Sequence, residues 1–196
     1  MKKIHSIKDS LLKATLVTSV FLMASCSSSP KPEDTKVVAE EHNEAKFDNN
    51  KQEKDAQFLV NAAEINLEHI QLGQLAQQSG TAMHVKELGE IIEVAHTKLQ
   101  GELNTLAQRK SITIPGSSTE DTQDAYKKLQ EKSGNDFDKA YADRMVNEYK
   151  DAIATFEKAA TDCEDTDIKN WANATLPDLR KYLDLSIECQ KKCEKR

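Results

Sequence analysis

Apolar residues recur at steps of three and four along most of the chain, a spacing that predicts amphipathic helices. The first two predicted helices cover about residues 52–78 and 82–109. Their apolar stripes contain Phe58, Ala62, Ile65, His69, Leu72 and Ala76, and then Val85, Gly89, Ile92, His96, Leu99, Leu103 and Leu106. Each stripe therefore carries one histidine on a face that should be buried.

Two further long helices are predicted at about residues 136–161 and from about residue 166 onward, and Pro177 should kink or restart the last one. Their stripes contain Ala142, Met145, Tyr149, Ala152, Phe156 and Ala159, and then Ile168, Ala172, Thr175, Leu179, Tyr182, Ser186, Cys189 and Cys193. A short helix at about residues 123–132 falls in the long connection between the two pairs. Such a crossover predicts an all-α fold of the ferritin-like four-helix bundle type rather than a simple up-and-down bundle.

The residues before Cys26 look like a bacterial lipoprotein signal segment. Four lysines among the first 13 residues precede an apolar run at 14–24 that is too short to span a bilayer. The run ends in Met23-Ala24-Ser25-Cys26, where a small residue precedes a cysteine, as in a lipobox. We therefore expect cleavage after residue 25 and lipidation at Cys26. The alternative is an ordinary secreted protein that is cleaved nearby.

Composition divides the mature chain into two parts. Residues 26–50 hold Pro30, Pro32 and many charges but few bulky apolar side chains, which predicts a lipidated cysteine followed by a disordered tether. Residues 51–196 are long enough for one helical domain. Removal of residues 1–25 takes away four Lys and one Asp, so the formal net charge changes from −6 to −9. A chain this acidic, without a basic stripe, is not expected to bind nucleic acid.

Several short motifs spread over about residues 55–189 are typical of a known group of sequences. They are Glu68–Leu75, Ala95-His96-Thr97-Lys98, the Ser133-Gly134 turn with Phe137–Tyr141 and Met145-Val146, and Leu176-Pro177-x-Leu179. Through them the chain resembles an uncharacterised family of secreted bacterial domains with a ferritin-like fold, often described as predicted outer-membrane proteins. The resemblance implies a fold and a compartment but no reaction, because the family's activity is not established.

The resemblance also implies a difference in the polar residues of the helices. Members of that family typically carry an Asp-His pair on the second helix, another on the third, and a histidine on the fourth after the Leu-Pro. The corresponding positions here read Ala95-His96, Glu148-Tyr149 and Tyr182. Because tyrosine stands at two of the three histidine positions, a site that depends on all of them would be incomplete in this chain.

Counting from the two tight turns places Glu68, His69, His96, Tyr149 and Tyr182 at similar heights along the bundle, which predicts one polar layer in an apolar interior. Di-iron sites in bundles take a Glu from each of two helices and a Glu-x-x-His from each of the other two. Glu93-x-x-His96 matches one half, and Glu68 and Glu148 could be the single carboxylates. The second Glu-x-x-His is absent.

Three interpretations of this layer stay open. The favoured one is structural: Glu93 is solvated, and His69 and His96 are core residues that hydrogen-bond to neighbouring Glu or Tyr side chains. In the second, Glu68, Glu93, His96 and Glu148 hold a divalent metal with a reduced ligand set. In the third, His69 and His96 form a pH-responsive switch, because burial disfavours a charged imidazole.

Three cysteines remain after Cys26, an odd number for an oxidising periplasm: Cys163, Cys189 and Cys193. A bridge from Cys163 to Cys189 would need the last helix to fold back at Pro177, and one from Cys189 to Cys193 would be strained. The latter pair could also bind a soft ion such as Cu(I). Intermolecular disulfides or exposed thiols are favoured, because no third soft ligand lies nearby in sequence.

The sequence lacks Gly-x-Ser-x-Gly, His-Glu-x-x-His and any cysteine with a histidine placed to activate it. We therefore expect a lipid-anchored, periplasm-facing module of the cell envelope that binds a partner or has a structural role, rather than an enzyme. Ser27 after Cys26 favours the outer membrane, by resemblance to enterobacterial sorting. The expected partners are the membrane and an envelope protein. The alternative is a metal-binding ferritin-like protein for iron-type storage or redox chemistry.

Overall fold

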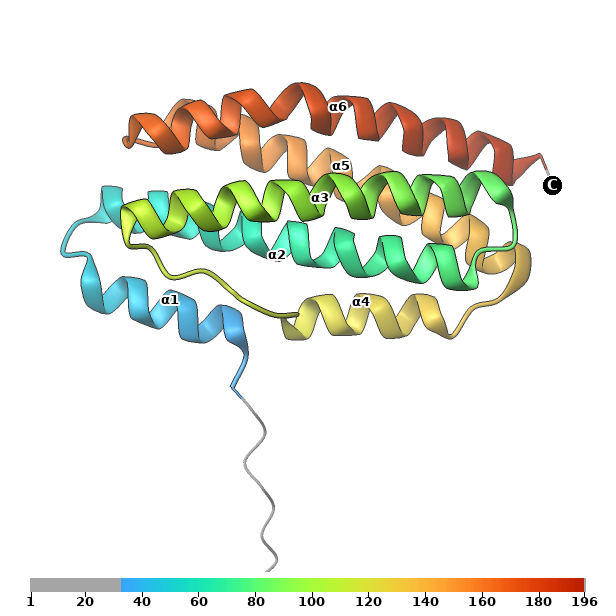
Figure 1. Cartoon of the computed structure of the whole chain (residues 1–196), viewed down its shortest axis with the longest axis horizontal. Helices are drawn as coiled ribbons and strands as arrows, with labels where there is room; N and C mark the ends of the chain where they lie inside the picture. Colours follow the sequence, from blue (N-terminus) through green and yellow to red (C-terminus); the bar gives the residue numbers. More distant parts are fainter. Residues whose placement is uncertain (1–32, 196) are drawn as a thin grey trace, which may run out of the picture. The chain divides into compact units, whose positions relative to one another are not determined.

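The computed structural model describes residues 33–195, whose regular structure consists of α-helices (Figure 1). The helices are α1 (Thr35–Lys46), α2 (Asn50–Ser79), α3 (Met83–Lys110), α4 (Glu120–Gln130), α5 (Gly134–Asp162) and α6 (Thr166–Glu194). The predicted all-α fold class is confirmed. No helix in this described part has a stretch both long and apolar enough to span a membrane. The predicted signal segment and Cys26 lie outside the described residues.

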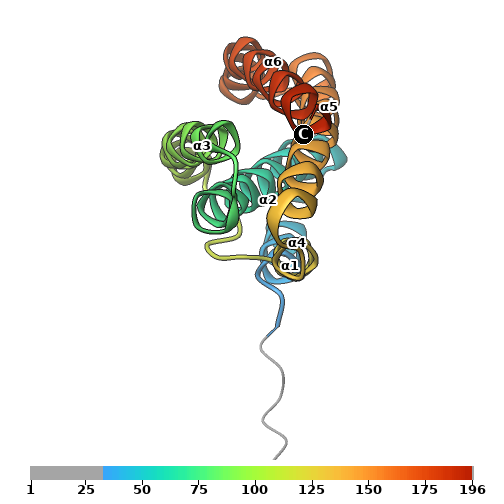
Figure 2. The same cartoon turned by 90° about the vertical axis from the view of Figure 1, so that its right-hand side faces the viewer.

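The four long helices form two hairpins that pack against each other (Figures 1 and 2). A tight turn at residues 80–82 joins α2 to α3, and another at 163–165 joins α5 to α6. α2 also contacts α5, and α3 contacts α6, so the apolar faces of all four helices share one core. The short helices α1 and α4 both pack on α2, and α4 lies in the long connection between α3 and α5.

Two glycines let α2 and α3 approach closely. A Cβ atom built on Gly89 would lie 2.7 Å from the Gly73 carbonyl oxygen and 2.8 Å from the Ala76 Cβ. A Cβ on Gly73 would lie 2.7 Å from the Gly89 carbonyl oxygen. Any side chain at either position would therefore force the two backbones apart.

The N-terminus of α3 is capped by a side chain from another helix. Its own N-cap residue, Ala82, offers no side-chain hydrogen bond. The Asp138 carboxylate of α5 instead accepts hydrogen bonds from the backbone N–H groups of Thr81 and Ala82, both at 2.9 Å, and from the Thr81 hydroxyl at 2.6 Å. The start of α3 is thereby fixed on α5.

The predicted disordered tether over residues 26–50 is wrong for the part that the structure describes, which starts at residue 33. Residues 35–46 form α1, and the compact unit begins at Glu33 rather than at residue 51. α1 is held by polar contacts: the Asn43 amide exchanges hydrogen bonds with the backbone of Thr113, and Lys36 pairs with Glu64 at 2.6 Å. Composition does not predict this helix, because few of its residues are bulky and apolar.

The other helix boundaries need small corrections. α4 begins at Glu120 rather than at residue 123, because the Thr119 side chain caps it by accepting from the Thr122 N–H. α6 runs through Pro177 as one continuous helix and is not restarted there.

Candidate functional site

Four aromatic rings from four helices meet in the middle of the domain. His69 of α2 stacks on His96 of α3, with ring centroids 4.3 Å apart. Tyr149 of α5 lies 4.8 Å from His69, and Tyr182 of α6 lies 5.9 Å from Tyr149 and 6.3 Å from His96. His69, His96 and Tyr149 have no exposed surface. These rings, called the ring cluster below, occupy the height where the sequence predicts a polar layer.

Hydrogen bonds assign a neutral tautomer to His96. Its Nδ1–H donates to the Asn66 side-chain oxygen at 2.9 Å, and its Nε2 accepts from the Tyr149 hydroxyl at 3.0 Å. His69 donates from Nδ1 to the Ile65 carbonyl oxygen at 2.8 Å, whereas its buried Nε2 has no hydrogen-bond partner. Both nitrogens of His96 are therefore engaged by protein atoms.

Burial controls the ionisation of the ring cluster. Loss of solvation lowers the pKa of His69 to about 4, well below the usual value near 6.5. It also lowers the pKa of His96, and the adjacent His69 adds to that effect. Burial raises the pKa of Tyr149. The cluster is thus a neutral assembly at physiological pH.

An arginine bridges two of the carboxylates predicted as metal ligands. The Arg144 guanidinium of α5 lies 2.5 Å from a Glu68 carboxylate oxygen and 3.0 Å from one of Glu148. Burial raises the pKa of both carboxyl groups, that of Glu148 to about 7, despite the opposing effect of Arg144. Arg144 was not among the residues predicted from the sequence, although its position one turn before Glu148 is a recognisable helical ion-pair spacing.

Glu93 does not join the other predicted ligands. Its two carboxylate oxygens accept hydrogen bonds from Gln74 at 2.8 Å and Gln77 at 2.5 Å, on the outer side of the α2–α3 pair. The predicted set of Glu68, Glu93, His96 and Glu148 is therefore not assembled as one site. Spacing along α3 suggested the pair Glu93 and His96, but the rotation of the helix turns only His96 inward.

Cys163 lies apart from the other two cysteines of the domain. It borders a groove of about 640 Å³ between α2 and α5, together with Phe58, Ala159 and other residues. Burial raises the pKa of its thiol to about 12, with Asp55 adding to the shift. Cys163, Cys189 and Cys193 are all buried, so the expectation of exposed thiols is wrong, and none is bonded to another as a disulfide.

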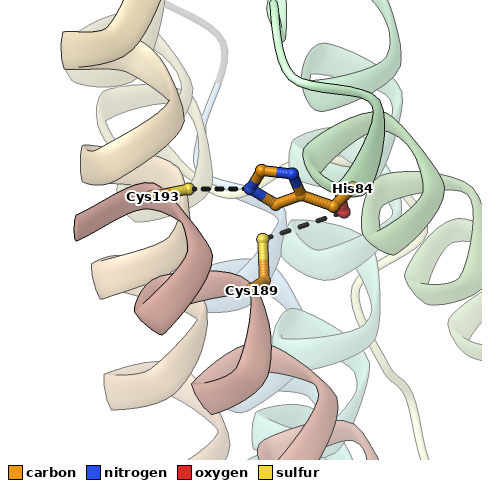
Figure 3. A group of neighbouring side chains, drawn as sticks. All are labelled: His84, Cys189 and Cys193. Atoms are coloured by element: carbon orange, nitrogen blue, oxygen red, sulfur yellow. Dashed lines mark hydrogen bonds between the residues drawn. The ribbon is translucent and has the colours of Figure 1, made fainter. Parts of the chain in front are cut away.

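The structure brings one histidine to the two cysteines near the end of α6 (Figure 3). Nε2 of His84, on the first turn of α3, lies 3.3 Å from Cys193 Sγ. The Cys189 thiol donates to the His84 carbonyl oxygen at 3.8 Å. The expectation that no cysteine has a histidine partner is therefore wrong. No local signal could have found this partner, because His84 and Cys193 are 109 positions apart.

Comparison with known proteins adds one match. Neither the comparison with curated proteins nor that with solved structures found a significant relative. Residues 40–186, about three quarters of the chain, match a family described as a domain of unknown function, DUF4142. The matched range begins within α1 and ends within α6, so it includes the ring cluster and Arg144. The chain belongs to the DUF4142 family.

Proposed function

We propose that this protein is a lipid-anchored module of the bacterial cell envelope, with a ferritin-like bundle that binds an envelope partner or has a structural role and does not catalyse a redox reaction. The anchor is inferred from the lipobox-like residues Met23-Ala24-Ser25-Cys26. The non-catalytic role is inferred from Arg144 and the ring cluster at the centre of the bundle.

The observation that carries this proposal is the position of Arg144. In ferritin-like proteins the carboxylates at the centre of the bundle hold metal ions. Here a guanidinium group contacts both Glu68 and Glu148. A fixed positive charge between two carboxylates supplies the neutralisation that a metal would supply, and it repels a cation. Arg144 therefore supports a structural role for this layer.

The state of His96 supports the same conclusion. Metal ligation needs a lone pair on one imidazole nitrogen, but Nε2 of His96 already accepts from Tyr149. The ring is fully buried, so a metal or substrate would have to open the bundle to reach it. The ring cluster is best explained as a polar layer whose hydrogen bonds fix the register of α2, α3 and α5, with Tyr182 of α6 packed against it.

The anchor is tested by feeding an alkyne-labelled fatty acid to bacteria that express the full chain and measuring the label on the purified protein. Wild type should be labelled and should sediment with membranes. Cys26→Ser should lose both properties, whereas Cys163→Ser should keep them. Equal labelling of wild type and Cys26→Ser would refute lipidation at Cys26.

The non-catalytic role is tested with the full chain carrying Cys189→Ala and Cys193→Ala, so that the thiols of α6 contribute no binding. After incubation with Fe(II), Mn(II) or Zn(II) and desalting, less than a tenth of an equivalent of metal per chain should remain. Retention of one or two equivalents that His96→Ala abolishes would refute the proposal. Oxidation of Fe(II) with saturating kinetics would refute it as well.

A further inference from the structure

Two helices that are distant in sequence place a pair of sulfurs and an imidazole together, away from the ring cluster. Cys189 and Cys193 lie one turn apart on the same face of α6, and His84 reaches them from the first turn of α3. The potential donor atoms of the three residues all lie within 4.8 Å of one another. This is the only such group of three or more His, Cys, Asp or Glu side chains in residues 33–195.

We propose that His84, Cys189 and Cys193 form a binding site for a thiophilic d10 cation, either Zn(II) or Cu(I). Two sulfurs and one imidazole nitrogen are the ligand types that these ions prefer, whereas Mg²⁺, Ca²⁺ and Mn²⁺ prefer oxygen. The site is separate from the proposed function of the bundle centre and does not depend on it.

The donor distances are close to those of an assembled site. With metal–sulfur bonds of about 2.3 Å and metal–nitrogen bonds of about 2.0 Å, tetrahedral ligands lie about 3.5–3.8 Å apart. The observed separation of 3.3 Å between His84 Nε2 and Cys193 Sγ is already near that value. With every donor pair within 4.8 Å, small side-chain rotations would complete the geometry.

Packing around the site holds the ligands in place. The Asp138 side chain fixes the turn that precedes His84. The backbone carbonyl oxygen of Asp138 accepts a hydrogen bond from the Cys193 thiol at 3.6 Å. Both sulfurs are buried, with 3% and 2% of Cys189 and Cys193 exposed, whereas His84 is partly exposed. The imidazole therefore lies on the side from which an ion would enter.

Both ions displace two thiol protons, and the net charge of the occupied site distinguishes them. Zn(II) that forms two bonds to sulfur and one to nitrogen displaces both thiol protons and gives a neutral site, with water available as a fourth ligand. Cu(I) bound to two thiolates also releases two protons but leaves one net negative charge. Because either ion must displace the thiol protons, its binding should weaken as pH falls.

A disulfide between Cys189 and Cys193 is the competing fate of these thiols. Each thiol donates to a different backbone carbonyl oxygen, Cys189 to that of His84 and Cys193 to that of Asp138, and the two cysteine side chains also contact each other. A bridge of two residues one turn apart in a helix also conflicts with the preferred disulfide geometry. This conflict in geometry favours binding of an ion over oxidation to a disulfide.

The test uses the full chain with Cys26→Ser, reduced and kept anaerobic. Zn(II) and Cu(I) are added separately, and their affinities are measured by competition with chromophoric chelators. Co(II) is added as a spectroscopic probe, because thiolate ligation gives charge-transfer bands in the near ultraviolet. We expect one equivalent of metal per chain and a thiolate–cobalt band. The ion that the protein still binds in the presence of the stronger chelator is assigned as the cation of this site.

The variants separate ligation from folding. Cys189→Ala and Cys193→Ala should each weaken binding at least a hundredfold, and His84→Ala at least tenfold. Cys163→Ala, which removes a buried cysteine elsewhere in the domain, should bind as wild type does. Circular dichroism confirms that each variant is folded. If Cys189→Ala is not folded, Cys189→Ser is measured in its place. Three results would overturn the proposal. They are equal metal affinity in Cys163→Ala and Cys193→Ala, the absence of a thiolate–cobalt band in folded wild type, and a Cys189–Cys193 disulfide that re-forms in the presence of metal.

Discussion

Two tyrosines on α5 are buried to the same extent but differ in what their hydroxyl groups contact. The Tyr149 hydroxyl donates to His96, whereas the Tyr141 hydroxyl has no hydrogen-bond partner. A buried polar group without a partner costs free energy, and removing half of a buried hydrogen bond strands the other half. The two residues should therefore respond oppositely to the same change.

We expect Tyr149→Phe to lower the free energy of unfolding by about 1–3 kcal/mol, because Nε2 of His96 loses its donor. Tyr141→Phe removes an unpaired hydroxyl and should leave stability unchanged or raise it by about 1 kcal/mol. Urea unfolding followed by circular dichroism measures both. A larger loss in Tyr141→Phe than in Tyr149→Phe would show that the hydrogen bond of His96 is not a stabilising one.

The ring cluster should also make stability depend on pH. Because the folded pKa values of His69 and His96 lie below the unfolded value near 6.5, the unfolded state binds more protons in acid. Stability contributed by these imidazoles is present above pH 6.5 and declines below it. The loss between pH 7.5 and pH 5 is about 2 kcal/mol for His69, whose folded pKa is about 4. His96 adds a loss in the same direction.

Glu148 should oppose this loss. Its folded pKa is raised to about 7, so its folded state takes up a proton more readily than the unfolded state and gains stability as pH falls from about 7 to 4.5. Glu68, whose pKa is raised as well, acts in the same direction. Unfolding measured from pH 7.5 to 5 should thus show a steeper decline in Glu148→Gln than in wild type. A flat profile in both proteins would rule out buried neutral imidazoles.

At the scale of helices, the contact between α2 and α3 depends on Gly73 and Gly89. We expect Gly89→Ala to destabilise the domain by about 1–3 kcal/mol, because its Cβ would collide with backbone of α2. Gly101→Ala, in the same helix with no atom within 4 Å, should instead stabilise it by about 0.5–1 kcal/mol. Thermal unfolding compares the two, and a stabilised Gly89→Ala protein would contradict the close approach.

The attachment of α1 to the rest of the domain depends on Asn43. Asn43 is 4% exposed and bonds to both backbone groups of Thr113, which ties α1 to the segment after α3. In Asn43→Ala, amide hydrogen exchange in residues 35–46 should accelerate at least tenfold, while exchange in α2, α3, α5 and α6 stays unchanged. Equal acceleration in all helices would mean that α1 is part of the global folding unit.

At the scale of the molecule, the proposed metal site would cross-link the two hairpins, since His84 belongs to one and the cysteines to the other. Zn(II) at a hundred times its dissociation constant should stabilise the fold by about 2.7 kcal/mol. The melting temperature of the full chain with Cys26→Ser should therefore rise with Zn(II). The rise should disappear in Cys193→Ala and persist in Cys163→Ala. A rise of the same size in Cys193→Ala would assign the stabilisation to another site.

The sequence alone determined the α-helical class, the approximate positions of the five helices after residue 50, and the residues of the ring cluster, because helical periodicity and register along a hairpin are local or additive properties. The lipidation of Cys26 also follows from a local pattern and stays a prediction. The tertiary structure alone decided that α1 is helical, that Arg144 lies between Glu68 and Glu148, that Glu93 turns outward, and that His84 meets the two cysteines. These features depend on the rotation and packing of helices that lie tens of residues apart, which no local pattern in the chain specifies.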